Sequence, residues 1–282
     1  MPALTEDQVA AFRRDGFLAP FDLLDAAELA ECQAGLERFE AWLGAPVNHA
    51  TEMNWRSMGH LALPWVARLA FDARILDAVA DLLGPDLMVY TSTFFIKDPG
   101  SPTVAAWHQD SAYYGLTPEE EVTVWIALTD ADQAAGCMEA LSFEGRPRLM
   151  HHRTRVVANS VNRASQTILE PLDDVGARAM PLKAGQFSMH HGLCPHRSGP
   201  NGAAHRRVGL GLNFIPPHVR GKLAEKPGAM LVRGEDRFGN FQLLRPPERE
   251  LDDDAVANHR LGVGLYHANY AAEEARHEQA FA

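Results

Sequence analysis

The feature that most limits the folds open to this chain is a change in sequence texture at Leu87. From there to residue 215, short segments rich in β-branched and aromatic residues alternate with turns marked by Gly, Pro and Asp. Many short strands between such turns are typical of a β-sandwich, a jelly roll or a barrel. The expected strands are 87–98, 122–132, 136–143, 154–159, 179–182, 186–190 and 208–215.

The first 85 residues have a helical pattern instead. Thr5 and Gln8 form a capping box ahead of one helix, Asp25 caps a second, and residues 63–83 carry an apolar stripe. Helices followed by strands predict a mainly β fold with flanking helices. We expect a single domain over 1–282, with a helical N-terminal support (1–85), a β core (86–219) and a C-terminal extension (220–282) that ends in a solvated helix.

Composition excludes several classes of protein. The net charge is −11 and the pI is about 5.6, so a basic nucleic-acid surface is not expected. The three cysteines form no CxxC pair, which argues against a zinc knuckle or a disulfide framework. Neither GxGxxG nor GxxxxGK[ST] occurs, and no apolar stretch is long enough to span a bilayer. We therefore expect a cytoplasmic protein without a nucleic-acid or membrane partner.

Two polar residues, His108 and Asp110, lie at the end of a strand-like segment in the sequence WHQD. Residues i and i+2 of a strand point to one face, about 7 Å apart at the backbone, so both side chains can reach one ion. This pair alone is weak, but His196 follows a later strand and Arg207 comes 11 positions after it, at 207 − 196. Two histidines and one carboxylate form the facial triad of non-haem Fe(II). An arginine beside it can bind a carboxylate bidentately.

Two points of this assignment stay open at the level of the sequence. Other histidines lie near enough to replace His196 if the strand register differs, and Arg206 competes with Arg207 because adjacent strand residues face opposite sides. Only His196 precedes the RSGPN turn with the expected spacing to the arginine. The competing histidines are His190, His191 and His205, whereas His151 and His152 are expected in a loop.

On these residues the chain resembles the phytanoyl-CoA dioxygenase family of Fe(II)/2-oxoglutarate oxygenases, over roughly residues 5 to 245. The resemblance implies a double-stranded β-helix, or jelly-roll, core. It implies that His108, Asp110 and His196 ligate Fe(II), and that Arg207 binds the distal carboxylate of 2-oxoglutarate with help from Ser198. Tyr114 is a further candidate for the co-substrate pocket. The motifs are FFIKDPGS, WHQDSAYYGL, VTVWIALTDAD, GCM, HRSGPN and LVRGEDRFGNF.

The implied reaction is hydroxylation of an unactivated C–H bond by O2, with release of succinate and CO2 from 2-oxoglutarate; ascorbate is a common addition in vitro. Asp110 argues against halogenation, because related halogenases replace this carboxylate with a small residue. Desaturation or ring formation would use the same ligands. A non-catalytic metal-binding cupin and a zinc hydrolase are alternatives, although neither needs Arg207.

The sequence indicates the substrate only weakly. A small metabolite with a carboxylate, phosphonate or quaternary amine, or a natural-product intermediate, is expected, and the oligomeric state is left open. The segment after GCM lacks the Pro-Gly-Ser/Thr-His turn of many family members, which indicates a changed pocket rim. Candidate substrate contacts are His49, Asn54 and Arg56 in the loop 44–59, with Ser92 and Lys97 on the first core strand as lesser candidates.

Overall fold

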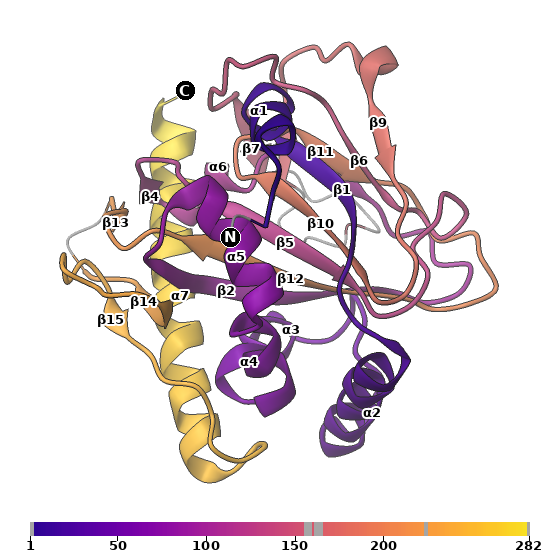
Figure 1. Ribbon diagram of the computed structural model, residues 1–282, viewed down its shortest axis with the longest axis vertical. Helices are drawn as coiled ribbons and strands as arrows, with labels where there is room; N and C mark the ends of the chain where they lie inside the picture. The colour runs from indigo at the N-terminus through magenta and orange to yellow at the C-terminus, as the bar shows by residue number, and fades with distance from the viewer. Residues whose placement is uncertain (1–2, 155–159, 161–165, 223–224, 281–282) are drawn as a thin grey trace.

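The computed structural model describes residues 3–154, 160, 166–222 and 225–280. Within them, a large sheet with strand order β1-β10-β5-β12-β2-β14-β15 faces a smaller sheet with order β3-β11-β6-β9 (Figure 1). The strands are β1 Phe17–Asp22, β2 Leu87–Lys97, β3 Ala105–His108, β4 Leu116–Thr117, β5 Val122–Ala127, β6 Met138–Ala140, β7 His152–Thr154, β8 Gln166–Ile168, β9 Arg178–Met180, β10 Gln186–His191, β11 His196–Ser198, β12 Arg207–Ile215, β13 Arg220–Gly221, β14 Gly228–Arg233 and β15 Gln242–Leu243. The predicted mainly β fold with a jelly-roll core is confirmed.

The described helices are α1 Glu6–Asp15, α2 Ala26–Leu43, α3 Met53–Arg56, η1 Gly59–Leu61, α4 Pro64–Ala70, α5 Ala73–Leu83, α6 Ser111–Tyr114, η2 Asp174–Gly176 and α7 Asp253–Ala280. Of these, α2, α4 and α5 pack their apolar side chains on the large sheet on the side away from the small sheet, and α5 crosses in front of the sheet in Figure 1. Thr5 forms the predicted capping box of α1, and Asp25, the predicted cap of α2, forms a capping box with Glu28. The predicted stripe over 63–83 is divided into two helices, because the Asp72 side chain accepts a hydrogen bond from the Arg74 N–H and starts α5 afresh.

The alternation of side chains along β12 separates the core from the site. Every residue of this strand is buried, and Leu210 and Leu212 join the core beneath the helices. The odd-numbered residues face the small sheet, and two of them are glycines. A Cβ on Gly209 would lie 1.9 Å from the Trp125 ring, and one on Gly211 would lie 3.0 Å from Phe95. These glycines therefore leave the space between the sheets open for other side chains and for a ligand.

The C-terminal helix α7 is not the solvated helix that the sequence suggested. It buries Ala255, His259, Val263, Asn269 and Glu273 along one side. The polar members of this set are paired: His259 Nε2 lies 2.9 Å from the Ser57 carbonyl, and Asn269 donates to the Tyr90 hydroxyl at 2.9 Å. Because this buried face is partly polar, the apolar periodicity that marks a packed helix is missing from the sequence.

The hairpin of β7 and β8 differs from expectation in one respect. His152 begins β7 and its Nε2 accepts a hydrogen bond from the Gln109 N–H at 3.0 Å, so it is not a loop residue. Of the strand predicted over 154–159, residues 155–159 lie outside the described part of the chain.

Among the described helices, none combines the length and apolar character needed to cross a membrane.

The close packing of Gly209 against the Trp125 ring can be tested by substitution. We expect Gly209→Ala to lower the free energy of unfolding by about 1–3 kcal/mol, because the added methyl meets the Trp125 ring. Gly264→Ala is the matched control: Gly264 lies on the exposed side of α7 with open space around it, so a gain of about 0.5–1 kcal/mol is expected. Urea unfolding measures both, and equal stability of Gly209→Ala and the unchanged protein would contradict the packing.

Candidate functional site

Two buried histidines face each other across neighbouring strands of the small sheet. His108 at the end of β3 is the register partner of His196 at the start of β11, and their ring centroids are 4.1 Å apart. Each ring is fixed by the backbone: His108 Nδ1 lies 2.8 Å from the Ala106 carbonyl and His196 Nδ1 lies 3.0 Å from the Cys194 carbonyl. A carbonyl only accepts, so Nδ1 carries the proton and Nε2 presents its lone pair.

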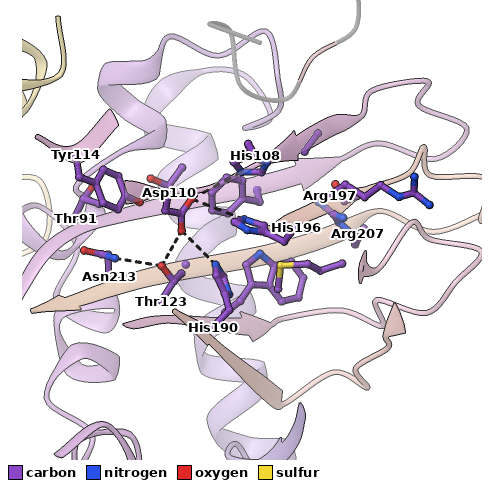
Figure 2. Close-up of a pocket in the computed structure, with 17 residues that line it drawn as sticks. Thr91, His108, Asp110, Tyr114, Thr123, His190, His196, Arg197, Arg207 and Asn213 are labelled. Carbon is purple, nitrogen blue, oxygen red and sulfur yellow. Dashed lines mark hydrogen bonds and ion pairs between the residues drawn. The ribbon is translucent and has the colours of Figure 1, made fainter. Parts of the chain in front are cut away.

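Asp110 divides its two carboxylate oxygens between different partners (Figure 2). Oδ1 lies 3.8 Å from Nε2 of His108 and 3.8 Å from Nε2 of His196. Oδ2 accepts a hydrogen bond from the Thr123 hydroxyl at 3.0 Å and lies 3.2 Å from His190 Nε2. Oδ2 is therefore anchored, and Oδ1 is left to point at the two imidazoles.

The electrostatics favour the charge states that a cation needs. Burial raises the pKa of Asp110, but the nearby His196 and the hydrogen bond from His190 outweigh it, so the net pKa is below the ordinary value. Burial lowers the pKa of both His108 and His196. The carboxylate is thus ionised while the imidazoles are neutral, which is the form in which each binds a metal.

The predicted ligands are the ones that the fold brings together. The donor atoms of His108, Asp110 and His196 all lie within 4.8 Å of one another, close enough to share one ion. Of the competing histidines, His190 reaches the same cavity but bonds the outer oxygen of Asp110. His191 Nδ1 accepts from the Leu193 N–H, and His205 Nε2 lies 2.9 Å from the Asp130 carbonyl.

Arg207 lies at one buried end of the same cavity, with Lys97 beside it on the neighbouring strand. They are register partners on β12 and β2, with 2% and 0% of their surface exposed. Arg207 donates to the Gly136 carbonyl at 2.5 Å and lies over Trp125, while its Nε has no hydrogen-bond partner among the described residues. Lys97 donates to the Ser198 hydroxyl at 2.8 Å. Burial lowers the pKa of Arg207 to about 10 and that of Lys97, which also faces Arg207, to about 6.

The sequence had left two points open at this end. Arg206 turns away from the cavity to Glu40 at 2.6 Å and Asp98 at 3.3 Å, so Arg207 is the inward arginine. Lys97, which the sequence allowed to be solvated, is instead fully buried. The missing signal was the strand register, because only the pairing of β2 with β12 places Lys97 against Arg207.

The remaining predicted site residues divide into two groups. Ser198 and Tyr114 line the cavity, which has about 620 Å³ of empty space including its open mouth. The predicted substrate contacts do not line it: Asn54 is exposed on α3, Arg56 is buried and reaches towards the His49 carbonyl at 3.5 Å, and Ser92 lies 2.8 Å from His60 Nδ1. The cause at Ser92 is alternation, since the cavity-facing residues of β2 are odd-numbered.

The C-terminal helix supports the cavity wall, which the sequence did not suggest. Asn269 donates to the Tyr114 carbonyl and to the Tyr90 hydroxyl, and Tyr266 packs against both tyrosine rings. Because Tyr114 ends the short helix that follows Asp110, α7 fixes the segment that carries a predicted ligand. A Cβ on Gly115 would collide with Asn269, so the glycine permits this contact.

Glu121 is a buried carboxyl beside α6. It accepts a hydrogen bond from the Ser111 hydroxyl, and its Oε2 has no hydrogen-bond partner among the described residues. Gly192 makes the room for it, because a Cβ there would fall 1.8 Å from Glu121 Oε1. Burial raises the pKa of Glu121 to about 8. At neutral pH this carboxyl is therefore protonated, which spares the site a second negative charge near Asp110.

The family follows from a comparison of this chain with known proteins. The model of the phytanoyl-CoA dioxygenase (PhyH) family matches residues 12–209. The chain belongs to this family. The family is one of Fe(II)/2-oxoglutarate-dependent dioxygenases, and its cofactor and co-substrate, Fe(II) and 2-oxoglutarate, fit the carboxylate–histidine cluster and the buried guanidinium.

The individual proteins that this PhyH-family chain resembles share about a quarter to a third of its residues over the matched regions. A solved structure described as "non-heme monooxygenase; ThoJ apo" is 33% identical, covers 94% of this chain and 98% of its own, and has a TM-score of 0.81. The "Probable alpha-ketoglutarate-dependent hypophosphite dioxygenase" of Stutzerimonas stutzeri is 27% identical over 151 residues, 52% of each chain. An ectoine dioxygenase of Bordetella parapertussis is 28% identical over 147 residues, 48% of this chain and 47% of its own. The chain spans about half the length of the hypophosphite dioxygenase and of the ectoine dioxygenase that it matches.

The raised pKa of Glu121 predicts a pH dependence of stability. The folded chain holds the Glu121 proton more tightly than the unfolded chain does. The stability that this proton gives the folded state is therefore full below the ordinary pKa of 4.5 and is lost as pH rises through about 8. Across this window the free energy of unfolding of the unchanged protein should fall because of Glu121 by up to about 1.4 kcal/mol per pH unit. We expect Glu121→Gln to remove this fall. Urea unfolding at several pH values measures it.

The readout is the difference between the variant and the unchanged protein at each pH. The depressed pKa of Lys97 acts in the opposite direction between about 6 and 10.5, and it cancels in this difference. The same exchange at the exposed Glu37 is the control for the loss of a surface carboxylate and should not reproduce the effect of Glu121→Gln. A pH-independent difference for Glu121→Gln would show that Glu121 is not buried as a neutral acid.

Proposed function

We propose that this protein binds Fe(II) through His108, Asp110 and His196, binds 2-oxoglutarate against Arg207, and hydroxylates an unactivated C–H bond of a small molecule. The observation that carries the proposal is that one cavity holds both the three-residue cluster and a buried guanidinium with an unpartnered Nε among the described residues. A metal site alone would not need the cation, and a carboxylate site alone would not need the cluster.

The donor set fits Fe(II). Two imidazole nitrogens and one carboxylate oxygen are the ligands of the facial triad, which leaves the opposite face of the ion open to a co-substrate and O2. Their backbone and hydroxyl partners hold the rings and the carboxylate before any ion is bound. Bound Fe(II) would supply the activation of O2 that accompanies the oxidative decarboxylation of 2-oxoglutarate to succinate and CO2.

The cationic end fits the distal carboxylate of 2-oxoglutarate. The Arg207 guanidinium can donate two parallel hydrogen bonds to it, and the Ser198 hydroxyl lies beside Lys97 at the same end. A carboxylate there would offset the cost of burying the Arg207 guanidinium, whose pKa is depressed without it. Trp125 and Phe95 then wall the cavity and exclude water from the reacting centre.

Desaturation and ring formation require the same ligands as hydroxylation, so the product distinguishes them. Halogenation is disfavoured, because Asp110 occupies the position at which a halide would need to bind. A protein that only binds the metal and its ligand would release no succinate, which separates that alternative from an enzyme.

The first test is an anaerobic titration. Fe(II) and 2-oxoglutarate together should give a weak visible charge-transfer band, which His108→Ala should abolish. Arg207→Ala should weaken the binding of 2-oxoglutarate by at least about thirtyfold, because a buried charge pair is broken. Arg206→Ala, next to it but turned outward, is the matched control and should retain the affinity. No band in the unchanged protein, with hydrolysis supported by zinc instead, would contradict the proposal.

A second test concerns the hydroxyl that anchors Asp110. Thr123→Val keeps the shape of the side chain and removes the hydrogen bond to Oδ2, so the carboxylate loses part of its fixed orientation. We expect the dissociation constant for Fe(II) to rise about ten- to a hundredfold. The same exchange at Thr103, a buried threonine that pairs with Ser101 outside the cavity, should leave it unchanged. Equal affinities of the two variants would show that this anchor does not matter.

A further inference from the structure

The cavity continues past Asp110 on the side away from Arg207. Figure 2 shows Thr91, Tyr114 and Asn213 on one side of the cluster and Arg207 on the other. Arg207 and Asn213 stand at opposite ends of the cavity-facing row of β12, six residues and roughly 20 Å apart along the strand. If 2-oxoglutarate fills the part between Arg207 and the cluster, the far part is left for the second substrate.

Two buried polar atoms at this far end lack partners. Thr91 on β2 and Asn213 on β12 are register partners, each with 2% of its surface exposed, so their side chains stand next to each other in the cavity. Thr91 Oγ1 and Asn213 Oδ1 have no hydrogen-bond partner among the described residues. Buried polar groups are nearly always paired, and an unpaired one costs stability unless a ligand or water meets it.

The chemistry of the pair is fixed by a neighbour. Asn213 Nδ2 donates to the Thr123 hydroxyl oxygen at 3.2 Å, and that hydroxyl donates to Asp110. The amide is thereby oriented with its nitrogen towards Thr123, which leaves its oxygen, an acceptor only, as the atom without a partner among the described residues. The Thr91 hydroxyl can donate or accept. A single alcohol group placed between them can donate to Asn213 Oδ1 and accept from Thr91 Oγ1.

The charge of the lining selects against ionic groups at this end. The residues that line it are Thr91, Tyr114, Thr123 and Asn213, none of which is charged at neutral pH. The cationic residues of the lining are elsewhere: Arg207 is at the far end, and Arg197 is paired with Glu139 at 2.6 Å and Asp174 at 3.0 Å. Asp110, the acidic residue next to this end, is already engaged by Thr123, His190 and the two imidazoles. A carboxylate, phosphonate or quaternary amine would therefore find no free counter-charge beside Thr91 and Asn213.

From this pairing we propose that Thr91 and Asn213 form the recognition site for a neutral hydroxyl or N–H group of the substrate, which holds the adjacent carbon over the metal. The proposal rests on the function proposed above and narrows its substrate class. It departs from the ionic small molecules that the sequence suggested.

A series of probes with one common body tests the proposal. Cyclohexanol carries the required group, methoxycyclohexane lacks the donor, cyclohexylamine is a cation and cyclohexanecarboxylate is an anion. Each is titrated under nitrogen into the protein loaded with Fe(II) and 2-oxoglutarate, and binding is measured by calorimetry. Cyclohexanol should bind about tenfold or more tightly than each of the others, because a site with buried polar groups rejects an analogue that leaves them unpaired.

A variant and a matched control assign this preference to the pair. Asn213→Leu removes the acceptor that only the alcohol can use, so it should reduce the ratio of alcohol to ether affinity to within about twofold. Thr91→Val is the control on the neighbouring strand: it removes a donor that both probes can use, so it should weaken both and keep the ratio of the unchanged protein. The charge-transfer band of each variant is recorded first, so that loss of the metal site is not mistaken for loss of recognition.

The outcomes separate this proposal from the proposed function. Absence of the band in the unchanged protein counts against the proposed function, and the same titrations on the metal-free protein then still test the preference for the alcohol. A normal band with equal affinities for alcohol and ether, with tightest binding of a charged probe, or with no binding of any probe would overturn the recognition site. An unchanged ratio in Asn213→Leu would overturn it as well.

Discussion

Asp110 presents one carboxylate oxygen to two imidazoles at 3.8 Å, while Thr123 and His190 hold the other oxygen. Much of the site depends on this division. Without the hydroxyl and the outer histidine, a buried carboxylate would be free to turn away or to take up a proton, and the three donor atoms would not converge. His190 thus serves the ligand cluster from outside it, and the polar chain Asn213–Thr123–Asp110 links the cluster to β12.

Strand β12 joins the parts of the cavity in one line. One face of it packs on the helices through leucines, and the other carries Arg207, two glycines and Asn213 towards the small sheet. The glycines keep the middle open, the arginine faces the co-substrate end and the amide faces the opposite end. The strand therefore sets the order in which a carboxylate, a metal and a neutral polar group would lie along the cavity.

The sequence was sufficient for the features that depend on local pattern. The capping residues, the short strands and the ligand pair at the end of β3 all follow from residue type and spacing over a few positions. What the sequence could not predict depends on register and on distant contacts. Lys97 lies against Arg207 only because β2 pairs with β12, and Ser92 does not line the cavity because its parity places it on the opposite face.

The C-terminal helix shows a second limit. Its buried face carries His259, Asn269 and Glu273, which pattern analysis assigns to solvent, and their partners lie about 50 to 200 positions away in the sequence. The division of the chain into a helical support, a β core and an extension stays a prediction, although α7 contacts the short helix after Asp110.

Diffraction at the iron absorption edge, from anaerobic crystals grown with Fe(II) and 2-oxoglutarate, would locate both the metal and the co-substrate. Our prediction is one anomalous peak bonded to His108 Nε2, Asp110 Oδ1 and His196 Nε2, with His190 still bound to Oδ2 and the co-substrate carboxylate against Arg207. A peak bonded to His190, or a carboxylate placed away from Arg207, would contradict it.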